Sequence, residues 1–364
     1  MSAEERPLLQ HARIDRRTFL ASLLGAGAAA GLAACGTAHG SSTGRSSTAE
    51  AASADAALPS RVPSGTSLSV ASPDNGLNYQ LSGLEKQFSF RVSSWINLSD
   101  GPQVIDAFRA HSLDVAFNAG IPPIQAHYEG DSAKIVCVGQ NRVPDYIFLT
   151  KPHSNLKSVA QFKGKKLAFS QGQAQGVVLL RALKKAGVAI KDVDLVPLIS
   201  TQFLTALEAS QVDVAPVSIS QVPLYLDKYA SEGAHTIHTD VIDFLDVMWA
   251  PQTVLDDKAK LAAIVELIPL YAKATVWTWT HKQEWIKEYY VKNQGLTQKQ
   301  GEQLTALLGK PWFPTTWDAA IKWEQETADL LAQAGFDKPF DVEALFDRRF
   351  EGLAAKSVPA TYRT

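Results

Sequence analysis

The residues best suited to chemistry in this sequence are small polar side chains that follow two similar stretches of chain. Residues 107–123 read AFRAHSLDVAFNAGIPP and residues 206–223 read ALEASQVDVAPVSISQVP. Both carry Asp-Val-Ala, then a polar turn, Asn118–Gly120 or Ser218–Gln221, then a proline. Hydroxyls, amides and the free N–H groups of a helix start suit reversible binding of a small polar or anionic molecule. The matching flanks favour an internal duplication over a chance recurrence of a common strand sequence.

Further candidate ligand contacts lie at other predicted strand ends. The turn after the predicted strand 166–170 supplies hydroxyl, amide and backbone donors. Trp95 and Trp249 end segments at the predicted cleft and could line an apolar part of a ligand. Arg142 is the one basic residue near a predicted rim, where it could pair with an anion or lie on the surface. The full candidate set is Ser72, Asn75, Trp95, Ser99, Asn118, Ala119, Gly120, Arg142, Ser170, Gln171, Gly172, Gln173, Ser218, Ser220, Gln221 and Trp249.

The sequence carries no clear pattern for catalysis, a metal or a cofactor. The run 172–176 lacks the Lys-Ser/Thr of a P-loop and the middle glycine of a dinucleotide motif, and no G-x-S-x-G occurs. His235 and His238 have no third His or Cys nearby, so a structural or solvated role outweighs metal ligation. Cys137 lies in the apolar run KIVCVG and is expected to be a buried hydrophobe rather than a nucleophile. We therefore expect a binding protein, not an enzyme, with neither a cofactor nor a metal.

The elements that must position these residues alternate between strands and helices from Ser67 to Thr239. The pattern restarts after residue 150 and becomes entirely helical after about residue 252. This predicts an α/β protein of two lobes, each a mostly parallel sheet flanked by helices, with a helical C-terminal region. We expect lobe 1 to comprise 66–150 plus 240–364 and lobe 2 to comprise 151–239. Ligands of such sheets lie beyond the carboxyl ends of the strands, which is where the polar turns fall.

The helical C-terminal region is rich in tryptophan and charge. Glu284, Glu288, Glu324 and Glu326 have the spacing of solvated helix charges. Six tryptophans are expected to pack between helices rather than to form a ligand cage: Trp277, Trp279, Trp285, Trp312, Trp317 and Trp323.

Composition limits the classes of partner. The 364 residues carry a net charge of −2 and contain no Lys/Arg-rich run, so a nucleic-acid partner is disfavoured.

The first 65 residues are typical of export and tethering rather than of the fold. Arg16 and Arg17 precede an apolar stretch, 19–34, that is short for a membrane span. Residues 1–34 are thus predicted to be a twin-arginine export signal, with an N-terminal membrane anchor as the alternative. The sequence LAACG around Cys35 resembles a lipoprotein cleavage box, which implies a lipidated Cys35. Residues 35–65 would form a flexible tether, spanning roughly 30 Å, at the outer face of the bacterial cell membrane.

The chain resembles the substrate-binding proteins of ABC importers for aliphatic sulfonates, taurine and nitrate. The segments that carry this resemblance are 101–108 (GPQVIDAF), 113–116 (LDVA), 134–139 (KIVCVG), 152–168 (PHSNLKSVAQFKGKKLA), 179–187 (LLRALKKAG), 192–196 (DVDLV), 212–215 (VDVA) and 345–350 (LFDRRF). The resemblance implies a monomeric, lipid-anchored receptor that closes on a small ligand and delivers it to permease and ATPase subunits. It also implies crossings between the lobes near 149–151 and 240–246.

The sequence departs from the family at two places in the predicted cleft. The family often has a Gly-Ser turn followed by a histidine where this chain reads FSQGQAQG, 169–176. It often has a tryptophan where this chain reads PVSISQ, 216–221. Both changes favour a cleft rich in amides and hydroxyls. An enzyme on the same fold, similar to desulfinases or thiamine-pyrimidine synthases, is one alternative, although the loop 71–76 lacks the desulfinase cysteine. A ligand-sensing interaction protein is another.

Overall fold

The computed structural model describes residues 57–72, 74–98 and 100–364. These residues fall within one compact unit, Ala49–Thr364. The predicted export signal, Cys35, most of the tether and the candidate contact Ser99 lie outside the described residues.

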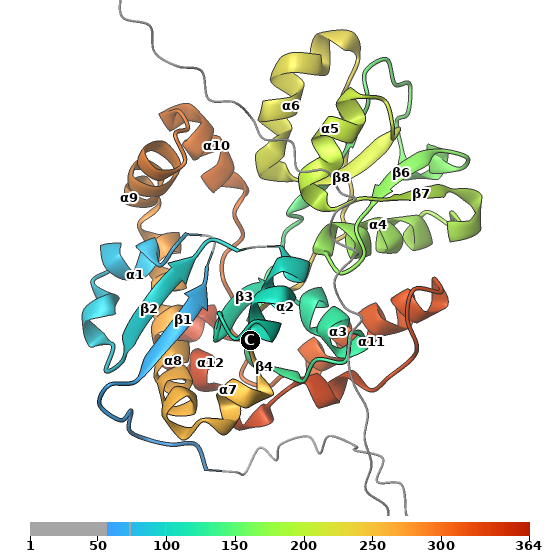
Figure 1. Ribbon diagram of the computed structural model, residues 1–364. Helices are drawn as coiled ribbons and strands as arrows, with labels where there is room; N and C mark the ends of the chain where they lie inside the picture. The colour runs from blue at the N-terminus through green and yellow to red at the C-terminus, as the bar shows by residue number, and fades with distance from the viewer. Residues whose placement is uncertain (1–56, 73, 99) are drawn as a thin grey trace, which may run out of the picture. The chain divides into compact units, whose positions relative to one another are not determined.

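The first lobe is built on a five-stranded sheet in the order β2-β1-β3-β10-β4 (Figure 1). β1 pairs in parallel with both β2 and β3, whereas β10 runs antiparallel to β3 and β4, so four of the five strands share one direction. Its interior is formed by apolar strand residues such as Leu68, Val70 and Val115, which are completely buried. The strands are β1 Ser67–Ala71, β2 Arg91–Ile96, β3 Val115–Ala119, β4 Ala133–Gln140 and β10 Leu245–Pro251.

The second lobe repeats this arrangement in the order β7-β6-β8-β5-β9. β6 pairs in parallel with β7 and β8, and β5 lies antiparallel between β8 and β9. Again one strand of five runs against the others. The strands are β5 Tyr146–Thr150, β6 Lys166–Phe169, β7 Asp194–Pro197, β8 Val214–Ser218 and β9 Thr236–Ile237.

Two features of this topology differ from the sequence prediction. β5 belongs to the second sheet, so the first crossover between lobes is 141–145 and not 149–151. The second crossover, 238–244, leads into β10, for which no strand was predicted. β10 enters the middle of the first sheet from more than 100 residues away, and local alternation of residue types cannot reveal such a long-range pairing.

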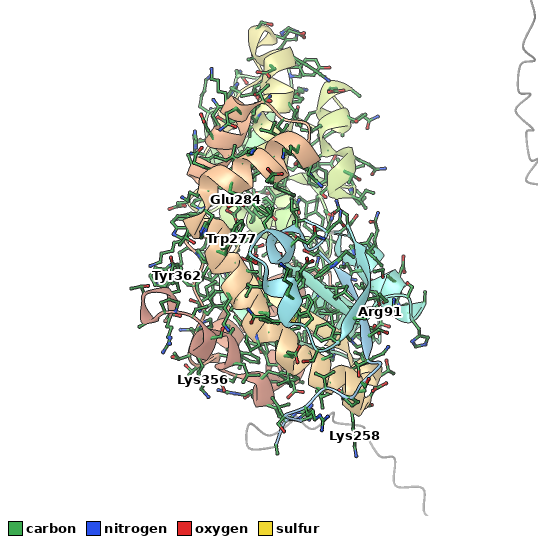
Figure 2. All side chains as sticks on the ribbon, turned by 90° about the vertical axis from the view of Figure 1, so that its left-hand side faces the viewer. Arg91, Lys258, Trp277, Glu284, Lys356 and Tyr362 are labelled. Carbon is green, nitrogen blue, oxygen red and sulfur yellow. The ribbon has the colours of Figure 1, made fainter. Side chains whose placement is uncertain are left out.

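Helices cover the sheets and make up most of the chain after residue 252 (Figures 1 and 2). The longest, α8, begins where the Asp257 carboxylate accepts hydrogen bonds from the N–H groups of Ala259 and Lys260 at 2.8 and 3.1 Å. It is apolar and long enough to cross a membrane, but half of its most apolar 18-residue stretch is buried, and the helix packs against the first sheet and neighbouring helices. The helices are α1 Leu77–Leu81, α2 Gly101–Arg109, α3 Ile121–Tyr128, α4 Ala174–Lys185, α5 Phe203–Glu208, α6 Val222–Tyr229, α7 Gln252–Asp256, α8 Lys258–Thr280, α9 Lys282–Trp285, α10 Gln298–Leu307, α11 Asp318–Gln333 and α12 Leu353–Ser357.

The repeated Asp-Val-Ala occupies the same structural position in both lobes, at the start of β3 and of β8. In the first lobe, Asp114 accepts the N–H of Ser69 and donates its own N–H to the Ser69 carbonyl. Asp213 makes the same two bonds to Lys166 in the second lobe. Each carboxylate also pairs with a lysine, Lys260 at 2.6 Å or Lys151 at 2.7 Å. The aspartates therefore join neighbouring strands, and the polar turns follow at the opposite strand ends.

Candidate functional site

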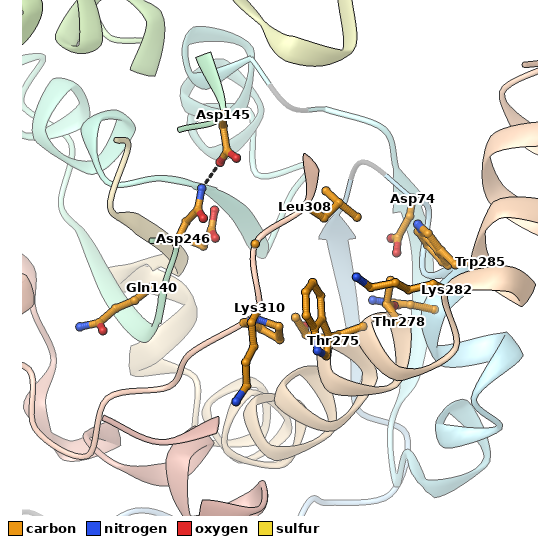
Figure 3. Close-up of a pocket in the computed structure, with 15 residues that line it drawn as sticks. Asp74, Gln140, Asp145, Asp246, Thr275, Thr278, Lys282, Trp285, Leu308 and Lys310 are labelled. Carbon is orange, nitrogen blue, oxygen red and sulfur yellow. Dashed lines mark hydrogen bonds between the residues drawn. The ribbon is translucent and has the colours of Figure 1, made fainter. Parts of the chain in front are cut away.

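A pocket of about 260 Å³ opens where the first lobe meets the first crossover (Figure 3). Three carboxylates from separate elements line this inner pocket: Asp74 after β1, Asp145 at the end of the crossover, and Asp246 in β10. Trp279 and Trp285 line it from the end of α8 and from α9. The other lining residues are Asn78, Gln140, Asn141, Thr275, Thr278, Lys282, Leu308, Gly309, Lys310 and Pro311.

The inner pocket continues into two further pockets. A middle pocket of about 340 Å³ shares Asp145 and Leu308 with the inner one. An outer pocket of about 1000 Å³ shares Tyr146, Ile219 and Leu304 with the middle one. The three pockets are neighbours that share lining residues, and together they are hereafter called the groove. It runs from the first lobe, past the first crossover, to α6 of the second lobe.

One wall of the groove is a helical arm, residues 282–308, formed by α9, the π-helix η7 Ile286–Asn293 and α10. α10 begins with a capping box between Thr297 and Gln300 and contacts the turn after β8. Tyr289 and Tyr290 of the π-helix line the middle pocket opposite Ser218 and Ser220. π-Helices are rare and are often found at functional sites. The arm thus brings aromatic side chains to the polar turn of the second lobe.

Three carboxylates in or next to the two crossovers are surrounded by protein atoms, which disfavours their charged forms. Burial, with Asp246 nearby, raises the pKa of Asp145 to about 7. Desolvation raises the pKa of Asp246 to about 6, although its side chain is exposed to the pocket. Asp243, in the second crossover, has a pKa well above its ordinary value because of burial and the neighbouring carboxylates. Strong perturbation of this kind is common at binding and catalytic sites.

The predicted donors of the turn 170–173 do not line the groove but connect the two lobes. Gln173 is buried; it accepts the Ser170 hydroxyl and the Ser200 N–H, and donates to Asp100 of the first lobe at 2.7 Å. The backbones also approach closely here, because a Cβ on Gly101 would lie 3.0 Å from the Gly172 carbonyl oxygen. Gln171 remains exposed. We call the Asp100–Gln173 contact the latch.

The side chains of Trp249 and Asn118 are hydrogen-bonded to each other. Trp249 is completely buried in β10, and its indole N–H donates to the Asn118 side-chain oxygen at 2.8 Å. Its ring meets Phe108 edge-on with centroids 4.8 Å apart. The expectation that Trp249 lines the cleft is wrong because its ring has no exposed surface.

The remaining first-lobe candidates lie beside the groove. The Ser72 hydroxyl donates to Asp74 at 2.5 Å and thereby helps to orient that carboxylate. Trp95 stacks on Tyr79 and lines a separate surface pocket. Arg142 donates to the Gln140 side chain at 3.1 Å and lies over the Trp312 ring, 4.9 Å from its centroid.

Gly120 and Glu324 meet beneath the turn that follows β3. A Cβ on Gly120 would lie 2.1 Å from a Glu324 carboxylate oxygen, so a larger residue there would require the Glu324 side chain to move. Glu324 is 1% exposed, which corrects its prediction as a solvated helix charge. Burial raises its pKa to about 8, opposed by the positive charge of Arg181.

Of the predicted contacts, Ser218 and Ser220 line the groove. Asn75, Ala119 and Gln221 are absent from the described lining of the three pockets. So are the other predicted contacts discussed in the preceding four paragraphs. Sequence reasoning missed Asp74, Asp145, Asp246 and the tyrosines of the arm. A signal did exist for two of them, since Asp145 and Asp246 adjoin the apolar runs YIFL and VMWA.

Two similar sheets, two crossovers and a groove reaching both lobes define a two-lobed fold of the periplasmic binding protein type. Residues 96–262 match the family model described as NMT1/THI5 like. Over 130 residues the chain is 32% identical to a protein of Escherichia coli (strain K12) named as an aliphatic sulfonates-binding protein. That alignment covers 36% of this chain and 41% of the relative, less than half of its length.

Two longer matches agree with this result. A protein of Bacillus subtilis (strain 168), named in the same way, is 24% identical over 257 residues, which are 70% of this chain and 76% of that protein. The alkanesulfonate-binding protein SsuA from Xanthomonas axonopodis pv. citri, solved with bound MOPS, superposes with a TM-score of 0.65 at 21% identity. This superposition covers 85% of this chain and 100% of that one. The predicted fold class and the predicted family resemblance are confirmed.

Proposed function

We propose that the chain is an extracytoplasmic receptor that captures a small polar solute in the groove and delivers it to an ABC importer. The supporting observation is that residues of both lobes and of a crossover line neighbouring pockets of the groove. A molecule in the middle pocket would touch Ser218 and Ser220 of the second lobe, Asp145 of the crossover and the tyrosines of the arm. Binding there would favour one angle between the lobes, which the permease and ATPase subunits could recognise.

The sulfonate-binding names of the relatives suggest the starting set of ligands. A small sulfonate, taurine or nitrate would find hydroxyl donors at Ser218 and Ser220, whose oxygens lie 3.0 Å apart. These groups carry no full charge, so they also suit a neutral or zwitterionic molecule.

Transport rather than catalysis is favoured by the state of the one described cysteine. Cys137 is buried in β4, and burial raises the pKa of its thiol to about 12. A thiol so far from its reactive thiolate form is a poor nucleophile. The fold alone does not distinguish a receptor from an enzyme, so turnover must be measured.

The receptor proposal is tested by screening sulfonates, taurine, nitrate, amino acids and pyrimidines by thermal shift, followed by small-angle X-ray scattering with each hit. We expect one class to raise Tm by mass action and to decrease the radius of gyration, with no chemical change in the ligand. Conversion of the ligand, or binding without compaction, would contradict the proposal.

A point substitution tests the second-lobe contact. Ser220→Ala should weaken the affinity for the hit about threefold to tenfold, the value of one hydrogen bond, without changing Tm of the free protein. Ser231→Ala, an exposed serine in the same lobe, is the matched control. Unchanged affinity in Ser220→Ala would remove Ser220 from the site.

The proposal includes a lipid anchor at Cys35, a flexible tether and a monomeric receptor outside the cytoplasm. Cys35→Ala should release the protein from the membrane fraction, because the acyl chains that hold it would not be attached. Cys137→Ala serves as the control for loss of a thiol. Membrane association that persists in Cys35→Ala would instead favour an N-terminal membrane anchor.

A further inference from the structure

The inner pocket carries more negative charge than a receptor for simple anions requires. Asp74, Asp145 and Asp246 reach it from a loop, a crossover and a strand. Figure 3 shows Asp145 and Asp246 on one side of the pocket and Asp74 across it, beside Trp285. Asp145 accepts a hydrogen bond from the Asn141 amide, and Asp74 accepts the Ser72 hydroxyl and the Gly76 N–H. All three are thus fixed by different parts of the fold and face one space.

These carboxylates form no salt bridge with a protein cation among the described residues, since no Lys, Arg or His nitrogen there comes within 4.0 Å of the three. Of the two lysines in the lining, Lys310 donates to the Thr361 carbonyl at 2.5 Å and lies over the Trp312 ring. Its ammonium therefore points away from the aspartates, as Figure 3 shows. Three aspartates and two lysines line the pocket, so one negative charge remains in excess when all five groups are ionised.

The second lysine shows what the aromatic wall of the pocket accepts. The Lys282 ammonium lies 3.5 Å from the centroid of the Trp279 ring, so this wall already binds an amine cation. Trp285, stacked on Tyr289 with centroids 4.5 Å apart, continues the same surface toward the middle pocket. Carboxylates and aromatic faces together are the usual environment of an organic ammonium group.

The raised pKa values of Asp145 and Asp246 agree with this geometry. A carboxylate surrounded by protein and by like charges gains when a cation arrives and loses when an anion arrives. A sulfonate group placed in the inner pocket would add a further negative charge beside three aspartates. The hydroxyls of the middle pocket and the apolar side chains of the outer pocket are better suited to the rest of the ligand, since of the three aspartates only Asp145 lines the middle pocket and none lines the outer one.

We propose that the ligand of this groove carries a protonated amine, which binds in the inner pocket among Asp74, Asp145 and Asp246. The ligand is then a zwitterion or an organic cation with an apolar body, and not a purely anionic sulfonate. This inference rests on the proposed receptor function, because it assigns the charge of that receptor's ligand.

The test compares three probes that share one apolar body, by calorimetry on the full-length protein at pH 7.5. They are 2-phenylethanamine, N-(2-phenylethyl)-2-aminoethanesulfonate and 2-phenylethane-1-sulfonate. We expect the two amines to bind at least tenfold more tightly than 2-phenylethane-1-sulfonate. The ratio of the affinities of the two amines distinguishes a cationic from a zwitterionic ligand. Equal or tighter binding of the sulfonate would overturn the proposal, as would the absence of binding by both amines at 10 mM. If the sulfonate bound tightly and closed the lobes, the amine proposal would be overturned, but the proposed receptor function would still hold.

Two further measurements test whether the aspartates of the inner pocket bind the amine. Asp246→Asn should weaken amine binding at least tenfold and leave sulfonate binding unchanged or tighter. Asp194→Asn, an exposed carboxylate outside the three pockets, is the matched control and should change neither. In the unsubstituted protein, amine binding at pH 6.5 should release protons, seen as a dependence of the heat on buffer ionisation. Amine binding with no proton release and no effect of Asp246→Asn would place the amine elsewhere and overturn the proposal.

Discussion

At the scale of single residues, the most consequential group outside the groove is Glu324. It is 1% exposed, one of its carboxylate oxygens has no hydrogen-bond partner within the described chain, and Gly120 packs directly against it. Because burial raises its folded-state pKa to about 8, the folded protein holds a proton that the unfolded chain releases near pH 4.5. Stability from this group therefore falls as the pH rises between these two values.

Glu324→Gln removes the charge and keeps the shape. At pH 9, where Glu324 is ionised, we expect the free energy of unfolding to rise by about 1–3 kcal/mol, the usual cost of an uncompensated buried polar group. At pH 4.5, where the carboxyl is protonated in the folded chain and half protonated in the unfolded chain, the change should be much smaller. Urea denaturation at both pH values measures the difference, and the exposed Glu284→Gln is the control (Figure 2). A loss of stability at pH 9 would mean that Arg181 outweighs the burial.

The crossover carboxylate Asp145 should give the free protein a pH dependence of the same sign. Its folded-state pKa of about 7 exceeds its ordinary value because of burial and the nearby Asp246, an effect that the hydrogen bond from Asn141 opposes. The unliganded protein should lose Tm as the pH rises from 5 to 8, and Asp145→Asn should flatten this slope. Differential scanning calorimetry checks this, with Tm moving roughly 2–4 °C for each kcal/mol. An unchanged slope in Asp145→Asn would assign the effect to another group.

The sequence identified some residues of the candidate site and missed others for definable reasons. Ser218 and Ser220 could be predicted because a repeat and a strand end mark them. Asp145 and Asp246 adjoin apolar runs that mark strands, but their meeting at the groove depends on strand pairings across the whole chain. Trp249 was misplaced for the same reason, since its strand lies inside a sheet rather than at its edge.

At the scale of elements, the two repeated aspartates make equivalent contacts in the two lobes. Asp114 and Asp213 each exchange two hydrogen bonds with a neighbouring strand and pair with a lysine. Alternating residue types indicated most strands to within a few residues, including β5 at Tyr146–Thr150. They could not assign β5 to the second sheet or find β10, because partners far apart in sequence decide both.

Asp114 is the more buried of the two aspartates, at 8% exposed, so its replacement should cost more. We expect Asp114→Ala to lower the free energy of unfolding by about 2–3 kcal/mol, since it leaves a strand N–H and Lys260 without their partner. Asp213→Ala, more accessible to water, should cost about 1–2 kcal/mol. Urea denaturation of both variants, with the exposed Asp227→Ala as control, measures the ranking. Equal small losses would mean that the ion pairs and strand bonds are replaced by water.

At the scale of the whole described chain, several contacts join the two lobes, and one of them is the contact between α10 and the turn after β8. The crossovers join them covalently, and α11 binds α4 through Arg181, which donates to Thr327 at 2.7 Å and lies over the Trp323 ring. At the N-terminal end of α4, the Gln173 side-chain amide donates to Asp100 across the lobes. Rotation of one lobe on the other must therefore break the latch or pivot about it.

The latch is the contact whose removal should change lobe closure without touching the groove. Gln173→Ala deletes a hydrogen bond to a carboxylate, a contact worth roughly 1.5–3 kcal/mol, and so shifts the lobes toward open forms. Because only the closed form binds ligand with both lobes, the apparent affinity should fall about tenfold or more, and the radius of gyration of the free protein should increase. Calorimetry and small-angle scattering measure the two effects, with the exposed Gln171→Ala as the matched control. If the radius of gyration grew while the affinity stayed constant, ligand binding and lobe closure would be independent, and the crossovers alone would set the geometry of the groove.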